Sequence, residues 1–238
     1  MAELYYDFHI HSCLSPCAAE DMTPRNIVNM MALAGFDIIA VSDHNSTLNC
    51  PAVVAAAQEV GIIAVPAMEL TTLEEVHVLC LLPDLAAAKE FGDYVYSRLP
   101  EIINRPEIFG EQQQMDANDR PLKKVEKLLI SAADIGIYDV YELVKSYGGT
   151  ALPAHIDRQS FSLISNLGMY DPTMQFPLVE LSKNCEVDGF KAMHKLNLGH
   201  IINSDAHNLE QIPDPQYKIQ VADLSAKGVI QAIEDSRV

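Results

Sequence analysis

The chain has no long uninterrupted apolar run, although 49% of its 238 residues are hydrophobic. A transmembrane helix needs about 20 consecutive apolar residues, so the sequence predicts no membrane segment and no membrane partner. The N-terminus also lacks the basic and apolar regions of a secretion signal, because Met1-Ala2-Glu3 leads directly into strand-like sequence. These two absences predict a cytoplasmic protein.

Basic residues are scarce in this chain. It has 16 lysines and arginines against 33 aspartates and glutamates, which gives a net charge of −17. Binding to duplex nucleic acid depends on lysine and arginine at the phosphates, and the longest basic run here is Lys123-Lys124. Stable duplex binding is therefore not expected, whereas a small phosphorylated substrate or a short oligonucleotide suits this charge. Bound divalent cations would offset part of this negative net charge.

Cysteines are few, odd in number and scattered along the chain, at Cys13, Cys17, Cys50, Cys80 and Cys185. A disulfide framework is not expected in a cytoplasmic chain of this size. Cys13 and Cys17 follow His9 and His11 closely. For these two cysteines, reduced thiols in a loop are favoured over metal ligands.

Strand-like and helix-like segments alternate along the sequence, which is typical of βα units. Strands are predicted at residues 5–8, 36–41, 62–65, 78–82, 150–154, 178–181, 201–203 and 219–221. Helices are predicted at residues 24–34, 52–60, 86–99, 138–147 and 226–235. The first helix has the clearest signals: Thr23 suits the N-cap, Pro24 suits the first helical position and Gly35 ends the helix.

The alternation breaks between residues 101 and 135, where Asp, Asn and Pro in segment 116–121 indicate a turn. We interpret this stretch as a small inserted hairpin or helical segment packed on a larger α/β barrel, with a structureless linker as the alternative. The length suits one α/β barrel or two small domains. The prediction is one domain over residues 1–238 with this insertion.

Residue types that bind metal ions occur beside most of the predicted strands: His9, His11, His44, Glu69, His77, His155, Asp205 and His207. His9 and His11 are two apart in a strand, so their side chains point the same way, and Asp205 and His207 repeat the spacing. The carboxyl ends of parallel barrel strands meet at one face. Imidazoles with carboxylates suit zinc, manganese or iron, so we expect a centre of two or three divalent ions that activates water for hydrolysis.

His77 does not fit a simple parallel barrel, because it precedes its apolar run instead of following it. Two explanations stay open. Either the strand begins before Thr72, or this strand is locally reversed.

The segments His9-Ile10-His11-Ser12, Ser42-Asp43-His44-Asn45, Ala154-His155-Ile156-Asp157 and Ser204-Asp205-Ala206-His207, with Glu69 and His77, resemble the motifs of the PHP (polymerase and histidinol phosphatase) family of metal-dependent phosphoesterases. The resemblance covers nearly the whole chain. It implies a distorted TIM-like barrel of seven βα units with a trinuclear metal centre at its mouth.

The resemblance also implies how the ligands are shared among the ions. His9, His11, Glu69 and Asp205 would hold one ion, and Glu69 would bridge to a second ion bound by His77 and His155. His44 and His207 would hold the third with an acid from the first loop. Here the chain departs from the commoner family pattern, and Glu20 is the predicted acid, with Asp21 as the alternative.

Other residues near these motifs have predicted supporting roles. His44, His207 and Asp205 are the candidates for assisting proton transfer during catalysis. Arg158 is predicted to clamp a substrate phosphate, with a surface salt bridge as the alternative. Asp43 is expected to orient His44 or cap a helix. His194 and His200 lie outside the motifs and are taken as structural.

The predicted function is hydrolysis of a phosphomonoester, or of the terminal phosphodiester of a nucleotide or short oligonucleotide, by a metal-bound hydroxide. One alternative is an amidohydrolase-like enzyme that cleaves carbon–nitrogen bonds, although no lysine lies at a middle strand end. The other is a non-catalytic, metal-stabilised module that serves a partner. The sequence leaves the substrate, the native metal and the oligomeric state open.

Overall fold

The computed structural model describes residues 1–236 and shows a mixed α/β fold. Its strands are β1 (Ala2–Ile10), β2 (Ile38–Val41), β3 (Ile63–Ala64), β4 (Ala67–Thr71), β5 (His77–Leu81), β6 (Gln113–Met115), β7 (Pro121–Lys124), β8 (Thr150–Pro153), β9 (Leu178–Ser182), β10 (Gly199–Asn203) and β11 (Lys218–Val221). Its α-helices are α1 (Pro24–Ala34), α2 (Cys50–Val60), α3 (Leu85–Arg98), α4 (Pro106–Phe109), α5 (Ile137–Ser146), α6 (Leu163–Leu167), α7 (Val187–His194) and α8 (Ala226–Asp235). The last two residues of the predicted 1–238 domain lie outside this description.

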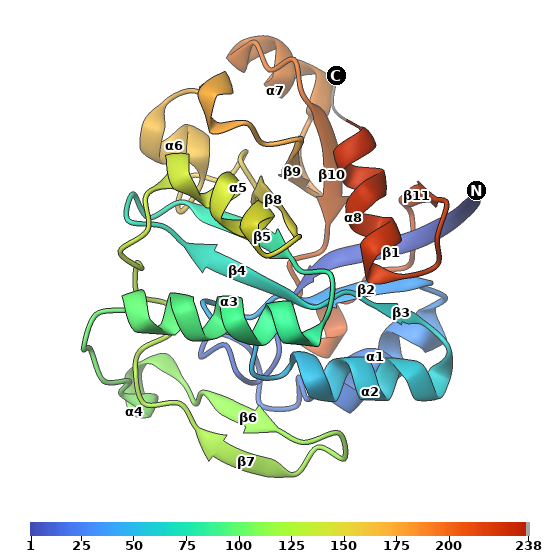
Figure 1. Ribbon diagram of the computed structural model, residues 1–238, viewed down its shortest axis with the longest axis vertical. Coiled ribbons are helices and arrows are strands. Elements are labelled where there is room, and N and C mark those ends of the chain that lie inside the picture. Colours follow the sequence, from blue (N-terminus) through green and yellow to red (C-terminus); the bar gives the residue numbers. More distant parts are fainter. Residues whose placement is uncertain (237–238) are drawn as a thin grey trace.

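Three sheets follow one another around a common interior (Figure 1). Their strand orders are β11-β1-β2-β3, β4-β5-β8 and β9-β10. Strand β2 lies beside β4, β8 beside β9, and β10 beside β1. These junctions have isolated contacts, such as the bridge between Ile10 and Ala206 and the bridge between His44 and Glu69. These three sheets therefore surround an interior. The hydrogen-bonded ladder between their strands is interrupted at the junctions, so the described strands do not form a closed barrel.

Strand β5 runs against its neighbours, which explains the position of His77. It is antiparallel to β4, with His77 opposite Thr71, and antiparallel to β8. A tight turn between β4 and β5 includes Glu75 at φ 58°. His77 thus begins its strand beside the end of β4, on the same edge as the other candidate ligands. Of the two explanations that the sequence left open, the reversed strand is confirmed.

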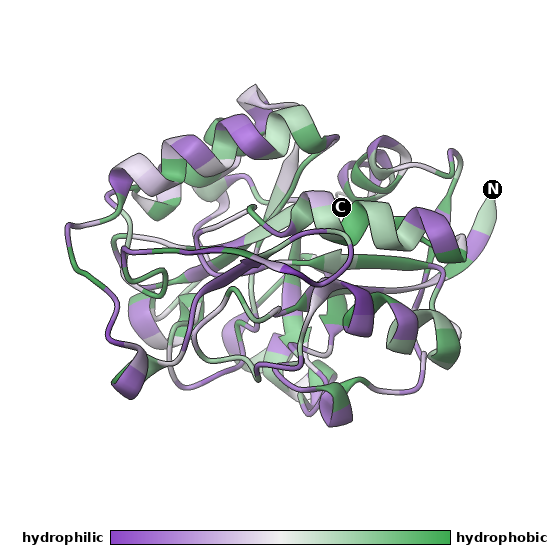
Figure 2. Ribbon diagram, turned by 90° about the horizontal axis from the view of Figure 1, so that it is seen from below, coloured by the Kyte–Doolittle hydropathy of each residue, from purple (hydrophilic) through white to green (hydrophobic). Residues whose placement is uncertain are grey.

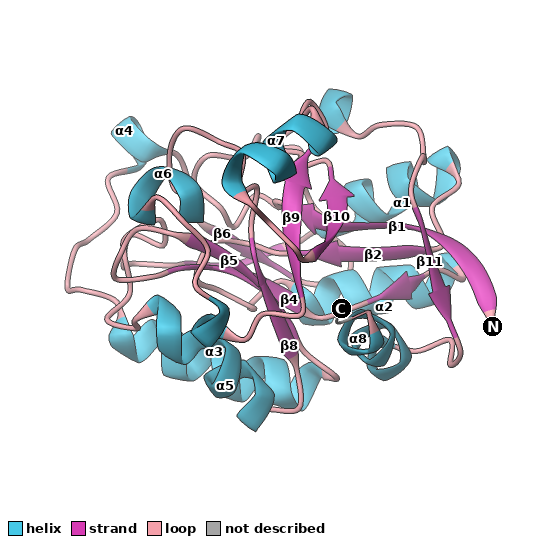
Figure 3. Cartoon of the chain, turned by 90° about the horizontal axis from the view of Figure 1, so that it is seen from above, coloured by secondary structure: helices cyan, strands magenta, loops and turns pink. Residues whose placement is uncertain are grey.

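The interior is filled by side chains from all three sheets. Phe8 of β1, Leu79 of β5 and Leu152 of β8 belong to one buried cluster, which Val229 and Ile233 of α8 complete. The longer helices lie on the outside of the strands (Figure 3). They alternate hydrophilic and hydrophobic segments along their length (Figure 2). No described helix has the length and apolarity needed to cross a membrane.

The structure confirms the predicted bounds of helix α1. The Thr23 side chain accepts a hydrogen bond from the backbone N–H of Asn26, and Gly35 ends the helix with φ 98°. Helices α2, α3, α5 and α8 also match their predictions to within two residues. Helices α6 and α7 were not predicted, and the third strand is shorter than expected because only Ile63–Ala64 pair with β2.

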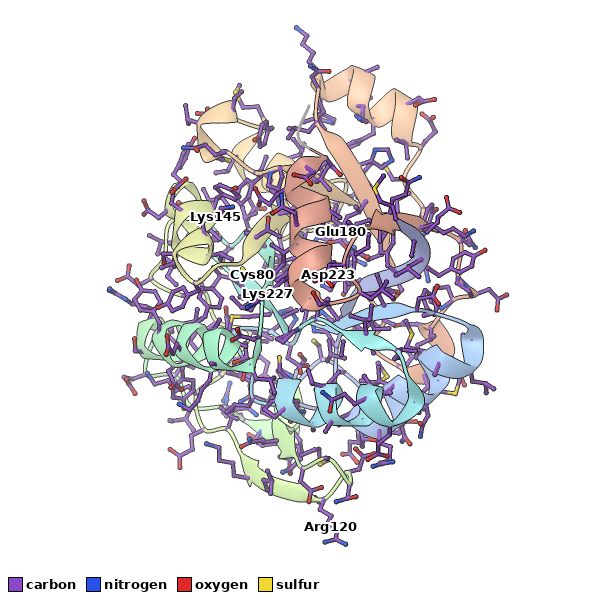
Figure 4. All side chains as sticks on the ribbon, turned by 45° about the vertical axis from the view of Figure 1, so that its right-hand side comes forward. Cys80, Arg120, Lys145, Glu180, Asp223 and Lys227 are labelled. Atoms are coloured by element: carbon purple, nitrogen blue, oxygen red, sulfur yellow. The ribbon has the colours of Figure 1, made fainter. Side chains whose placement is uncertain are left out.

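The segment between residues 101 and 135 contains the predicted hairpin. Strands β6 and β7 are antiparallel and project at one end of the molecule (Figure 1), with Arg120 near the turn (Figure 4). The hairpin is tied to the first loop, since the backbone N–H of Gln113 donates to the carbonyl of Cys13. Its turn residue Asp119 also accepts from the Thr23 hydroxyl at 2.5 Å. The segment is therefore packed on the fold and is not a structureless linker.

Candidate metal centre

Eight of the nine predicted ligands converge on one buried cluster. They come from six separate parts of the chain, within or beside β1, β2, β4, β5, β8 and β10: His9, His11, His44, Glu69, His77, His155, Asp205 and His207. Of these side chains, His207 is the most exposed. The strand ends that the sequence marked therefore meet in space.

Glu69 is the centre of this cluster. Its Oε1 lies 2.9 Å from His77 Nδ1 and 3.1 Å from both His9 Nε2 and His155 Nε2. Its Oε2 lies 2.9 Å from His44 Nδ1 and 3.3 Å from His11 Nε2. Each carboxylate oxygen therefore faces a different set of imidazoles.

Asp205 supplies the second carboxylate of the cluster. Its Oδ1 lies 3.1 Å from His11 Nε2 and 3.3 Å from His9 Nε2. Its Oδ2 lies 2.6 Å from the Arg158 guanidinium. Asp205 thus connects the His9-x-His11 pair to the basic residue that was predicted to contact substrate phosphate.

His155 Nδ1 is buried without a hydrogen-bond partner, and His44 Nδ1, Glu69 Oε2 and Asp205 Oδ1 are buried with only other candidate ligand atoms at contact distance. Buried polar atoms are normally satisfied. Four groups of three residues have ligand atoms within 4.8 Å of one another: His9/His11/Asp205, His9/Glu69/His155, His44/Glu69/His77 and His11/His44/His207. Unsatisfied oxygens and nitrogens that converge in this way fit divalent ions with mixed nitrogen and oxygen ligands.

The charges of the cluster are strongly coupled. Burial by itself would raise the pKa of Glu69, but the imidazoles of His77, His9 and His44 hold it well below its usual range. Burial opposes protonation of His11, yet hydrogen bonds and charge from Asp205 and Glu69 raise its pKa to about 9. The pKa values of His9 and His44 are raised as well, whereas those of His77 and His207 are lowered to about 4, mainly by burial. Without ions, protons on His9, His11 and His44 compensate the two carboxylates, so ions that bind here must displace protons.

Glu180 is a supporting residue that the sequence analysis missed. This β9 carboxylate is 1% exposed and lies in the interior (Figure 4). It lies 2.9 Å from His9 Nδ1 and accepts hydrogen bonds from the backbone N–H of His155 and the side-chain amide of Asn203. Such a carboxylate fixes the ring of a metal-binding histidine with its other nitrogen free. The available signal was a charged residue inside the apolar run Leu178-Val179-Glu180-Leu181.

A second network supports His11. The Ser15 hydroxyl lies 3.0 Å from His11 Nδ1 and donates to Asp43 Oδ1 at 2.7 Å. Asp43 also accepts hydrogen bonds from the backbone N–H and hydroxyl of Ser12. Asp43 is buried and belongs to none of the four ligand groups. Its contacts are those of the predicted orienting residue, although it acts on His11 through Ser15.

The backbone is strained at three positions around the cluster. Asn45, His155 and Asp205 have φ values of 48°, 29° and 51°, which non-glycine residues seldom adopt. Each is held by its surroundings; for example, the Asn45 side chain donates to the carbonyls of Leu129 and Ser131. Strain of this kind is concentrated at functional sites.

The structure does not bring the predicted first-loop acid into the cluster. Glu20 and the alternative, Asp21, are both exposed and belong to none of the four groups. Cys17 of the same loop is also exposed and outside the four groups, although a hydrogen bond with its thiol contributes to the raised pKa of His44. His194 and His200 also belong to none of the groups.

A cavity of about 280 Å³ opens beside His155 and Asp205. Its polar lining includes Arg158, Gln159 and Lys183. This volume is at the lower end of the range for small-molecule sites. A larger cavity of about 660 Å³, between α3 and β7, contacts none of the clustered ligands. The smaller cavity is therefore the better candidate for substrate, because chemistry at the cluster requires contact with it.

Together, the mixed α/β fold and the buried imidazole–carboxylate cluster provide a site that could hold metal ions. No protein-family model and no curated protein sequence matches this chain. Solved structures do match it, at low sequence identity.

The chain is similar to the lesion-specific endonuclease EndoQ from Pyrococcus furiosus, with 19% identity and a TM-score of 0.66 over 98% of this chain. It spans only 56% of that protein. It is also similar to a protein from Bifidobacterium adolescentis assigned as a metal-dependent phosphoesterase, with 17% identity and a TM-score of 0.60 over 98% of this chain and 96% of the other. An amidohydrolase from Chromobacterium violaceum matches at 18% identity, with a TM-score of 0.61 and coverages of 98% and 96%. At these identities the similarity shows the shared fold.

Proposed function

We propose that this protein is a metal-dependent phosphoesterase of the PHP type, with its strands arranged as a distorted seven-stranded barrel. The proposal rests above all on the position of Glu69, whose two oxygens face five imidazoles from four parts of the chain. Ions bound there would supply Lewis acidity and an activated water. Zinc, manganese and iron all suit these ligands.

The side chains of the site divide the remaining work. His9, His11 and Asp205 would hold one ion, and His77 and His155 would hold another together with Glu69. Arg158 and Lys183 line the adjoining cavity and attract the negative charge of a phosphate group. His207, which is partly exposed at the edge of the cluster, is placed to exchange a proton with a leaving group.

The proposed substrate is a phosphomonoester, or the terminal phosphodiester of a nucleotide or short oligonucleotide. The cavity is small and the net charge is −17, which disfavours a long duplex. The chain also spans only part of the endonuclease that it resembles. Lesion-specific cleavage of duplex DNA is therefore not part of this proposal.

The test is a hydrolysis screen with metal-depleted protein reloaded with zinc, manganese or iron. It includes nucleotides, sugar phosphates, histidinol phosphate and short single-stranded oligonucleotides. Hydrolysis that needs added metal and is abolished in Glu69→Gln supports the proposal. A metal-loaded, folded protein that hydrolyses none of these substrates refutes it.

Hydrolysis of a carbon–nitrogen bond is the second candidate, because the matched amidohydrolase shares this fold. That reaction would use the same ions and activated water. Among the described residues, the recorded ion-pair partners of Glu69 and Asp205 are imidazoles and Arg158, not the lysine that commonly bridges ions in amidohydrolase barrels. Amide and lactam substrates in the same screen separate the two candidates, since turnover of these alone would favour the second.

A further inference from the structure

One of the four ligand groups lacks an anionic residue. His9/His11/Asp205, His9/Glu69/His155 and His44/Glu69/His77 each contain a carboxylate, whereas His11/His44/His207 consists of imidazoles only. The acids expected to complete it, Glu20 and Asp21, are exposed and lie in none of the groups. A divalent ion at three neutral imidazoles would keep its full charge inside the fold, which favours an additional anionic ligand.

The first loop places Cys17 next to His44, within a segment that also contacts His11 and His207. On one side, the Ser15 hydroxyl contacts His11 Nδ1 at 3.0 Å. On the other, the backbone N–H of Ala19 donates to the carbonyl of His207 at 2.8 Å. Cys17 lies midway between these two anchors, and its thiol hydrogen-bonds the imidazole of His44. The loop therefore holds the sulfur next to the group that lacks an anion.

His44 belongs to two of the four ligand groups. It is 5% exposed, and its Nδ1 lies 2.9 Å from Glu69 Oε2. That nitrogen therefore faces the carboxylate of the His44/Glu69/His77 group, whereas the His11/His44/His207 group contains no carboxylate. Cys17 is exposed, so its side chain has room to turn from the His44 ring toward an ion.

We propose that Cys17 is the anionic ligand of an ion held by His11, His44 and His207, in the position that an acid was expected to fill. This inference rests on the metal centre of the proposed function. A thiolate is a soft ligand that suits zinc and iron better than manganese. The third ion position thus has a different metal preference from the two built on Glu69 and Asp205.

Cobalt substitution tests this proposal directly, because a thiolate bound to Co²⁺ gives a near-ultraviolet charge-transfer absorption that imidazole and carboxylate do not. The metal-depleted full-length protein is titrated with Co²⁺ as wild type, Cys17→Ser, Cys17→Asp and Cys13→Ser. Cys13 is the matched control, since it lies in the same loop but is buried with its sulfur toward the carbonyl of Gln113. Circular dichroism confirms that each variant is folded.

We expect the absorption in wild type and Cys13→Ser and its loss in Cys17→Ser. Cys17→Ser should also retain one ion fewer after dialysis, and Cys17→Asp should regain that ion without the absorption. A wild type that shows no such absorption, or a Cys17→Ser protein that keeps it, overturns the proposal.

A second measurement follows the same thiol without cobalt. Zinc should protect Cys17 from alkylation by iodoacetamide, as measured by peptide mass mapping, and equal modification with and without zinc counts against the proposal. Neither measurement uses a phosphate ester. A protein that binds cobalt through Cys17 but hydrolyses nothing would refute the proposed function and leave this inference standing.

Discussion

Glu180 and His9 are 171 positions apart in the chain, yet a Glu180 oxygen lies 2.9 Å from His9 Nδ1. Neither side chain is more than 1% exposed. The contact leaves His9 Nε2 facing Glu69 and Asp205. It therefore fixes which nitrogen of His9 is available to an ion.

Replacing Glu180 with Gln should weaken metal binding at His9. An amide offers one acceptor oxygen where the carboxylate now serves three donors, so the ring loses its charged partner. We expect the affinity for zinc to fall by about 10- to 100-fold, the usual effect of such partners. Competition with a chelator measures this affinity. Glu107→Gln is the control, because Glu107 is exposed, and equal affinities in the two variants would contradict the assigned role.

Metal affinity should rise as the pH increases from 7 toward 9. The pKa values of His11 and His44 in the metal-free protein are raised from 6.5 to about 9, against the opposing effect of burial. A raised pKa means that these rings carry protons at pH 7, and each proton must leave before its nitrogen binds an ion. Titration calorimetry in two buffers of different ionisation heat counts the released protons. No proton release at pH 7 would refute this prediction, and His200→Ala should leave the count unchanged.

Arg158→Ala should impair turnover of a phosphate substrate. The Arg158 guanidinium lies 2.6 Å from Asp205 Oδ2 and lines the cavity beside the cluster. A hydrogen bond to a charged group contributes about 1.5–3 kcal/mol, so kcat/KM should fall by about 10- to 100-fold, mostly through a higher KM. Arg120→Ala is the control, since Arg120 lies near the hairpin turn, far from the cluster (Figure 4). Unchanged kinetics in Arg158→Ala would leave Arg158 as a structural partner of Asp205 only.

Leu79→Ala should destabilise the fold. Leu79 is 0% exposed on the reversed strand β5 and packs in the cluster shared by the sheets. Removing a buried leucine side chain costs about 2–5 kcal/mol of the free energy of unfolding. Urea denaturation of the metal-depleted protein measures the change without a contribution from ions. Leu122→Ala, at a side chain that is 59% exposed, should change it by less than about 0.5 kcal/mol.

Much of the site was predictable from local sequence. His9 and His11 lie two apart beside an apolar run, and side chains two apart in a strand share a face. Helix α1 was equally readable, because Thr23, Pro24 and Gly35 act within the helix that they bound. In both cases the signal and its structural consequence lie within a few residues of each other.

Other features depended on partners that are distant in the chain. The direction of β5 follows from its pairing with β4 and β8. No residue pattern within His77–Leu81 indicates the direction of this strand. The position of the predicted first-loop acid could not be read from the sequence for a similar reason. Glu20 has the right chemistry at nearly the right distance in sequence, but its side chain is exposed and belongs to none of the four ligand groups.

The sequence by itself determined which residue types stand beside the strands, and therefore the kind of ions and chemistry that this protein suits, because ligand preference belongs to the side chain. Only the tertiary structure decided which oxygen faces which imidazole, that Glu180 fixes His9 and that one imidazole group lacks a carboxylate. Those relations are distances between segments up to about 200 residues apart, such as His9 and Asp205, and they are set by packing around a shared core.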